Sequence, residues 1–232
     1  MKHSFGFYLG IICTLVLGFG VLAGVWLGLS STKALGYIPN VLRATKTGAN
    51  TASLDLSTYP DSLVCHPDAQ HPELDWVTYC PTTYFEVPAN STVTVTITNY
   101  DGQTELHNDF FSNVMGTVDG TETVDGKAVS QVDAATVSHT FTIQSKPGTD
   151  HPLFVSVPVV GVPDDADTDP DTGYPTKPVI ISFQFQTGPA GIVYIFKCYD
   201  PCGNGLYNDQ QGFGGPMGTI GYMAGTMTVT NY

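Results

Sequence analysis

A short segment near the C-terminus concentrates residues that could bind a soft metal ion. Cys198 and Cys202 are separated by three residues and follow the apolar run 192–197, and a Gly-rich stretch then leads to Met217 and Met223. Thiolate, thioether and imidazole together suit copper, and a rigid β scaffold holds such ligands in place through redox changes. The competing interpretation is a plain disulfide between the two cysteines, with both methionines packed in a core.

The segments that must position these residues alternate between apolar and polar side chains, which is typical of strands. This pattern predicts strands at residues 84–88, 92–98, 137–143, 179–187, 192–197 and 226–230. No segment after residue 30 has a convincing helical period. Short strands joined by Gly/Pro turns predict an all-β fold, an antiparallel sandwich or barrel. His139 shares the parity of Val137, Phe141 and Ile143, which places it on the inner face of its strand.

Two insertions interrupt the strand pattern, at about residues 101–136 and 145–178. The first contains a hairpin-like sequence, Val124-Asp-Gly-Lys. The second contains alternating aspartates over residues 164–173, which could supply oxygen ligands to calcium. Because Pro170 breaks that pattern, a solvated acidic loop is the preferred interpretation.

Cys65 and Cys80 bracket a Pro-rich loop that contains His66 and His71. In an oxidising compartment, a structural disulfide is the expected state of two such cysteines. Each histidine precedes a proline in a turn, and we interpret both as turn surface rather than as metal ligands.

The N-terminus predicts a membrane segment, because residues 5–29 carry no charged side chain. A run of this length can span a bilayer with some tilt, whereas the apolar region of a cleaved signal peptide is normally shorter. We therefore expect an uncleaved single-pass anchor over residues 1–32, with an exported chain after it; a signal peptide would export the same part. Residues 33–60 have no clear period and are interpreted as a tether, so that the folded domain covers residues 61–232.

Gly20, Gly24 and Gly28 recur every four residues within the expected anchor. This spacing forms a glycine stripe on one helix face, where a partner helix in the membrane could approach closely. Glycine is also simply common in transmembrane helices, which is the alternative explanation.

The charge balance excludes nucleic acid as a partner, because such binding needs a basic surface. Eight Lys and Arg residues face 21 Asp and Glu residues, for a formal net charge of −13, and every acidic residue lies after residue 50. A strongly acidic exported domain could steer a basic redox partner, or serve solubility alone. Hydrolytic catalysis finds no support, because neither Gly-x-Ser-x-Gly nor His-Glu-x-x-His occurs.

Five segments resemble the cupredoxins, and most closely the copper domain of haem–copper oxidase subunit II. In chain order they are Val93-Thr-Val-Thr-Ile-Thr-Asn-Tyr-Asp101, Ser138-His-Thr-Phe-Thr-Ile143, Gly188-Pro-Ala-Gly-Ile-Val-Tyr-Ile-Phe-Lys-Cys198, Cys198-x3-Cys202-Gly-x-Gly and Met223-x-Gly-Thr-x-x-Val229. The resemblance covers about residues 84–232 apart from the insertions. It implies a cupredoxin-like antiparallel Greek-key β-sandwich behind one N-terminal transmembrane helix.

The resemblance also implies a ligand set for copper. Carried over by position, the ligands are His139, Cys198, Cys202, Met223 and the backbone carbonyl of Asp200. The dinuclear pattern has two further histidine positions, which are Leu206 and Ile220 in this chain. By sequence, His107 and His151 are the nearest histidines that could replace these ligands, and Met217 could supply a second thioether. The number of bound copper ions, one, two or none, therefore remains open.

Two functions follow from the resemblance. The first is a membrane-anchored extracytoplasmic copper protein that transfers electrons between redox partner proteins, including a subunit II-like component of a cytochrome c or quinol oxidase. No catalysis is expected from this chain alone. The second is a metal-free cupredoxin-like module for assembly or binding at the cell surface.

Overall fold

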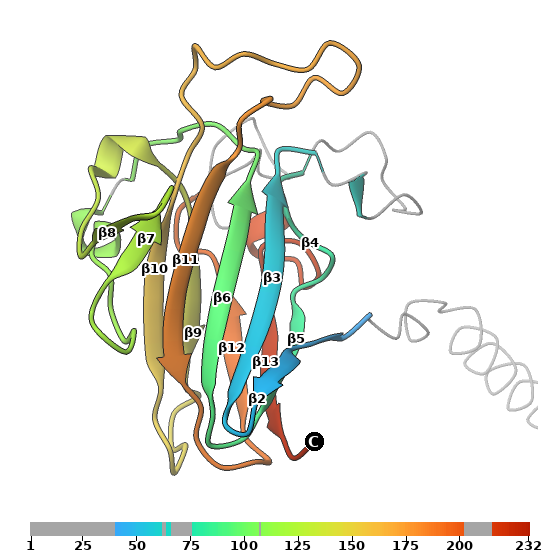
Figure 1. The fold of residues 1–232 in the computed structure, drawn as a ribbon, viewed down its shortest axis with the longest axis vertical. Coiled ribbons are helices and arrows are strands. Elements are labelled where there is room, and N and C mark those ends of the chain that lie inside the picture. Colours follow the sequence, from blue (N-terminus) through green and yellow to red (C-terminus); the bar gives the residue numbers. More distant parts are fainter. Residues whose placement is uncertain (1–39, 62–63, 66–75, 107, 202–214) are drawn as a thin grey trace, which may run out of the picture. The chain divides into compact units, whose positions relative to one another are not determined.

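Two β-sheets face one another and enclose the hydrophobic core (Figure 1). The computed structural model describes residues 40–61, 64–65, 76–106, 108–201 and 215–232, all within the unit Pro39–Tyr232. The six-stranded sheet has the order β1 (Leu42–Arg43), β5 (Tyr84–Pro88), β13 (Ala224–Thr230), β12 (Val193–Lys197), β9 (Val137–Gln144) and β10 (Phe154–Val160). The seven-stranded sheet has the order β2 (Thr45–Gly48), β3 (Thr51–Tyr59), β6 (Thr92–Asn99), β11 (Val179–Gln186), β7 (Glu122–Val124) and β8 (Lys127–Val129), and β4 (Thr78–Cys80) pairs with β3.

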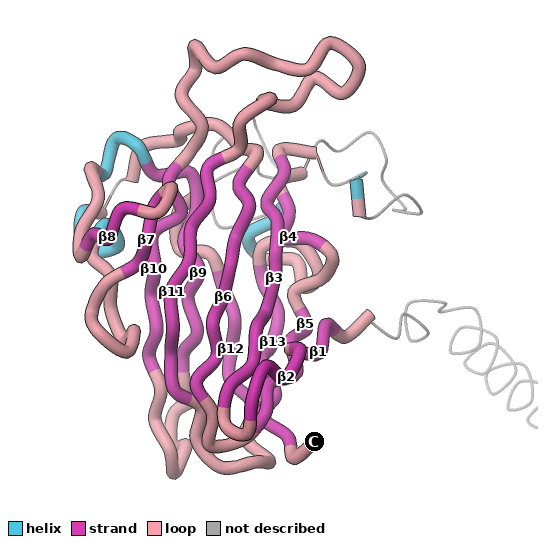
Figure 2. The backbone as a smooth tube through the Cα atoms, viewed as in Figure 1, coloured by secondary structure: helices cyan, strands magenta, loops and turns pink. Residues whose placement is uncertain are grey.

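Helix within the described residues is limited to short 3₁₀ turns in the loops (Figure 2). They include η3 (Asp109–Ser112), η4 (Ala134–Thr136) and η5 (Gly215–Met217). None of the described helices is long and apolar enough to cross a membrane. The expected anchor at residues 5–29, with its glycine stripe, lies outside the described residues.

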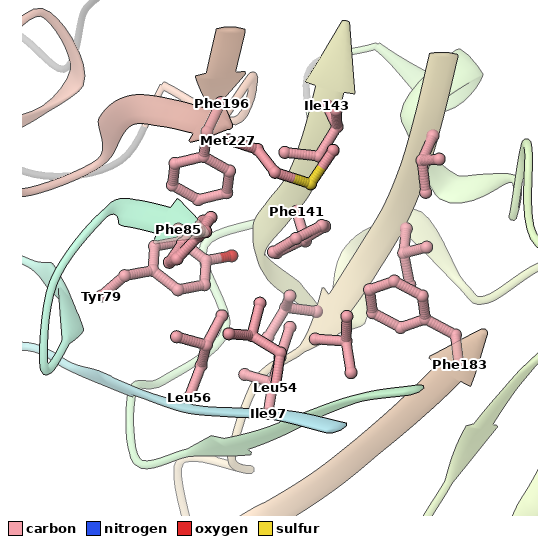
Figure 3. Close-up of a cluster of buried hydrophobic side chains, with 14 of the residues drawn as sticks. Leu54, Leu56, Tyr79, Phe85, Ile97, Phe141, Ile143, Phe183, Phe196 and Met227 are labelled. Carbon is pink, nitrogen blue, oxygen red and sulfur yellow. The ribbon is translucent and has the colours of Figure 1, made fainter. Parts of the chain in front are cut away.

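The predicted all-β fold is confirmed, and all six predicted strands are present. Apolar side chains of these strands face the core and polar ones face outward, as predicted. On β6, Val93, Val95 and Ile97 are fully buried, while the threonines between them are half-buried. Figure 3 shows the middle of this core, where Phe141 lies among Phe85, Phe196 and Met227. The ring centroids of Phe141 and Phe196 are 5.1 Å apart.

The expectation of a purely antiparallel sandwich is wrong for three strand pairs. β3 runs parallel to β6, and β5 runs parallel to both β1 and β13. In each of these pairs the two strands are not neighbours along the chain: β4 and β5 lie between β3 and β6, and several strands separate β5 from β1 and from β13. Strands that are not joined by a tight turn are free to pair in the same direction.

Residues 42–59, expected to belong to the tether, instead form β1, β2 and β3. β3 pairs with β6 from Thr51 to Thr58, so the folded unit begins near residue 39 rather than at residue 61. Within β3 every second residue is buried, including Leu54 and Leu56. The sequence does not predict this strand, because many of its side chains are small or carry a hydroxyl group and the alternation of apolar and polar residues is therefore weak.

Residues 145–178 are not wholly an insertion either, because they contain β10, which pairs with β9 along its length. Five consecutive residues of β10 are buried, so the strand shows no alternation. Pro158 is tolerated because β10 is the last strand of its sheet. In the other insertion the expected hairpin is confirmed: Asp125 and Gly126 connect β7 to β8 with positive φ values of 48° and 81°.

The expected disulfide between Cys65 and Cys80 is confirmed, with Cα atoms 5.8 Å apart. Cys80 ends β4, which pairs with the end of β3. The bond therefore ties the loop between β3 and β4 to the edge of the seven-stranded sheet.

Replacing both cysteines by serine is expected to lower the free energy of unfolding by about 3 kcal/mol, because the unfolded chain regains the freedom of a loop of about 15 residues. Urea unfolding of the double variant, beside wild type with and without reductant, measures this. Equal midpoints for wild type and variant under oxidising conditions would contradict the prediction.

Candidate metal centre

Three strand ends bring the sulfur and imidazole groups to one end of the sandwich. His139 is the third residue of β9, Cys198 directly follows β12, and Met223 directly precedes β13. Since β12 is antiparallel to both β9 and β13, the start of β9, the end of β12 and the start of β13 lie at the same end. All three side chains are fully buried.

The Cys198 sulfur lies in a polar niche made by its neighbours. It accepts a hydrogen bond from the backbone N–H of Thr140 at 3.3 Å, and the Asp200 carbonyl oxygen is 3.6 Å away. The His139 side chain is also within hydrogen-bonding reach of the sulfur. A backbone N–H aimed at sulfur stabilises a thiolate, which is the form that binds metal.

The imidazole of His139 lies between two acceptors. Its Nε2 atom is 2.8 Å from Oδ2 of Asp101, within ion-pair distance. Burial alone would lower the pKa of His139, but Asp101 and Cys198 beside it raise that pKa to about 10. The site therefore stabilises positive charge at this position, whether the charge belongs to a proton or to a metal ion.

Asn99 fixes the turn that presents Asp101. Its side-chain oxygen accepts hydrogen bonds from the Thr58 hydroxyl and from the Asp101 backbone N–H. Its side-chain nitrogen donates to the Asp101 carbonyl, to the Ser138 hydroxyl at 2.9 Å and to the Val160 carbonyl at 2.8 Å. One buried amide thus links β3, β6, β9 and β10 directly beside His139.

The methionines and Asp200 complete the buried surroundings of Cys198. The Cys198 backbone N–H donates to the Met223 carbonyl at 2.9 Å, and the Met223 N–H donates to the carbonyl of Pro216 in η5. Met217, in the same 3₁₀ turn, is also fully buried. The Asp200 carboxylate accepts a 2.6 Å hydrogen bond from Thr104, which fixes the loop after Cys198.

His151 does not join this group. It lies in the turn between β9 and β10, where its carbonyl accepts a hydrogen bond from the Tyr194 hydroxyl and its side chain faces Gly188. From His139 to the far end of β9 is roughly 17 Å of strand. The hairpin connection therefore carries His151 to the opposite end of the sandwich. The other two sequence candidates, Cys202 and His107, lie outside the described residues.

The described residues support a copper site only in part. No group of three or more His, Cys, Asp or Glu side chains gathers closely enough there to hold a metal ion. What is present is one buried imidazole beside one buried cysteine, with two buried thioethers in the adjoining segments. This donor chemistry fits a single soft ion.

The same geometry also resembles a Cys-His-Asp arrangement for nucleophilic catalysis, in which Asp101 would orient His139 and His139 would activate Cys198. Such a nucleophile must reach a substrate. Cys198 and His139 each expose 0% of their surface, so the arrangement offers no access for one.

Sequence reasoning placed Asp101 only within a motif and missed its contact with His139 and the roles of Thr104 and Asn99. The available signal was a polar pair, Asn99 and Asp101, at the end of an otherwise apolar-patterned strand. Polar residues at such a position are buried only when partners satisfy them.

No family model and no curated protein matches the chain. Among solved structures, it is similar to a chain of a heme–copper terminal oxidase dimer, at 11% identity over 97% of this chain and 99% of the other, with a TM-score of 0.30. It is also similar to reduced rusticyanin, at 16% identity over 83% of this chain and 87% of the other, with a TM-score of 0.31. A second rusticyanin structure, described as that of a copper protein, gives 16% identity, 80% and 86% coverage and a TM-score of 0.31.

Proposed function

We propose that this protein is a membrane-anchored, extracytoplasmic copper protein that transfers single electrons, either alone or as a subunit II-like part of a respiratory oxidase. The observation that carries the proposal is the buried contact between His139 and Cys198, with Met223 bonded through its backbone to Cys198. Imidazole, thiolate and thioether from three different strand ends form the donor set that copper prefers.

The chain's own residues would prepare this site. The Thr140 N–H stabilises the thiolate of Cys198, and Asp101 holds Nε2 of the His139 ring and so orients the imidazole beside Cys198. Full burial keeps water away from these groups. Bound copper would supply reversible one-electron redox chemistry. The rigid sheets behind the site would hold the donor atoms still when the charge changes.

The acidic charge supports a basic protein as redox partner, because opposite charge accelerates encounter. The aspartates of residues 164–173 lie in the loop between β10 and β11. β10 ends, and β11 begins, at the end of the sandwich where His139 lies. Anchoring by residues 5–29 would keep the domain at the membrane that holds its redox partners, and Gly20, Gly24 and Gly28 would let a partner helix approach.

One described residue favours the alternative, a metal-free cupredoxin-like module. Ile220 occupies one of the positions where the resemblance expects a second histidine, and 57% of its surface is exposed. An exposed isoleucine near the end of the sandwich suits contact with another protein better than metal binding.

Metal analysis combined with thiol counting separates the two functions. The full-length protein is purified, its thiols are counted with Cys65–Cys80 intact, and copper is added in steps while visible absorption is recorded. Stoichiometric copper with an intense thiolate-to-copper band supports electron transfer. Failure to bind copper with both Cys198 and Cys202 reduced would overturn it and leave the metal-free module.

Asp101→Asn is expected to weaken copper affinity by 10- to 100-fold, because removing the carboxylate next to His139 withdraws the charge that orients and polarises the ring. Competition with a chelator of known affinity measures the change. Asp55→Asn, at an exposed position on β3, is the matched control and should bind as wild type does. Equal affinities for the two variants would show that Asp101 is not coupled to the metal.

A further inference from the structure

Glu122 is a buried acid that the proposed copper site does not use. It begins β7, exposes only 1% of its surface, and neither carboxyl oxygen has a hydrogen-bond partner among the described residues. A buried polar group without partners is costly, and a buried charge costs far more. An acid in this position therefore has to keep its proton for the structure around it to stay closed.

Burial raises the pKa of Glu122 to about 9, and no charged neighbour contributes to the shift. The surrounding elements agree with this: β11 and β10 carry no titratable residue, and Asp119, Asp125 and Lys127, on either side of Glu122 along the chain, are exposed. Among the residues that the structure describes, no cation is therefore in place to compensate the carboxylate when it ionises.

The hairpin that contains Glu122 supports the cover of the Cys198 loop. β7 pairs with β8 and with β11. The segment after β8 bonds to the end of η3 and to the residues that follow it: the Val132 N–H donates to the Ser112 carbonyl, and the Val114 N–H donates to the Ser130 carbonyl. η3 carries Phe111, whose ring stacks on Tyr199 at 5.1 Å and 3°. Tyr199 directly follows Cys198, so hairpin, η3 and Cys198 loop form one connected unit.

We propose that Glu122 is a proton-dependent latch: protonated, it lets the β7–β8 hairpin close against β11, and ionised, it turns toward water and releases the hairpin together with η3 from Tyr199. The device does not depend on a bound metal ion, because every contact in it belongs to described residues outside the donor set.

The direction of the pH effect follows from proton counting. Below about pH 4.5 the acid is protonated in both the closed and the open state, so the latch is at its strongest. Between that pH and about 9 only the open state releases the proton. The opening equilibrium constant should then rise roughly tenfold per pH unit, and it should level off above that range.

Hydrogen exchange of the full-length protein between pH 5 and pH 8, corrected for intrinsic exchange rates, tests the latch. Amides of residues 112–132 should show an opening constant that rises by roughly three orders of magnitude over this range in wild type. The rise should disappear in Glu122→Gln. In Glu122→Leu, an apolar replacement, the opening constant should also not rise with pH. This second variant keeps the test possible if Glu122→Gln folds poorly.

Glu105→Gln, at an exposed position in the same insertion, is the matched control and should retain the wild-type slope. A wild-type opening constant independent of pH, or an unchanged slope in both Glu122 variants, would overturn the latch. Neither result would bear on copper binding, which is measured separately.

Discussion

Cys198→Ser is expected to abolish copper binding while leaving the sandwich folded. Serine is close in size to cysteine and fits the same buried position, but its hydroxyl is a poor ligand for a soft ion. The backbone bond from residue 198 to Met223 and the core beneath it do not depend on the sulfur. His139→Ala should have the same consequence for copper, because it removes the imidazole described at the site. Copper stoichiometry and the visible band, with circular dichroism as the check on folding, measure both variants.

The two methionines provide the contrast for this experiment. Met217 and Met223 are both fully buried, and Met223 directly precedes β13 and accepts the backbone N–H of Cys198 at its carbonyl. Met223→Leu should therefore weaken copper binding and shift the reduction potential, whereas Met217→Leu should leave both close to wild type. If Cys198→Ser retained one copper ion and the wild-type spectrum, the thiolate would not be a ligand and the proposed centre would be wrong.

Local alternation predicted the strands whose two faces meet different surroundings. β6 and β11 have one face in the core and one toward solvent, so their sequences alternate and their bounds were close to those observed. β10 is buried across both faces and β3 is built largely from small and hydroxyl residues, so neither gave a clear period. The parallel pairing of β3 with β6 was not predictable either, because it depends on which sheet the chain visits between them.

The sequence could predict those site residues that lie at the ends of recognisable strands. His139, Cys198 and Met223 were expected at one end of the sandwich, and the structure brings their strand ends together there. His151 lies at the opposite end of the sandwich, because nearness to β9 in the sequence does not tell which end of the strand the turn occupies. The contact of Asp101 with His139 joins residues 38 positions apart, across a turn fixed by Asn99, and no local pattern encodes it.

Asn99→Ala is expected to cost about 3 kcal/mol of unfolding free energy, because it removes a buried side chain that makes several hydrogen bonds. The change removes the amide that Thr58, Ser138 and the Val160 carbonyl share. The Thr58 hydroxyl and the Val160 carbonyl then lose this partner, at about 1–3 kcal/mol each before they relax, whereas the Ser138 hydroxyl keeps its bond to the Val159 carbonyl. Because small domains are stable by only about 5–15 kcal/mol, the loss should be plain in urea unfolding.

The matched control is Asn113→Ala, since the side chain of Asn113 donates two hydrogen bonds at the surface, to the backbone carbonyls of Asp109 and Phe110. Its loss should remain within about 0.5 kcal/mol, as for most surface substitutions. Asn99→Ala should in addition weaken copper binding, because the freed turn no longer holds Asp101 against His139. If Asn99→Ala destabilised the protein but bound copper with wild-type affinity, Asn99 would act in the sandwich alone and the Asp101 turn would be held by other bonds, such as that from Gly102 N–H to the Asp101 carboxylate.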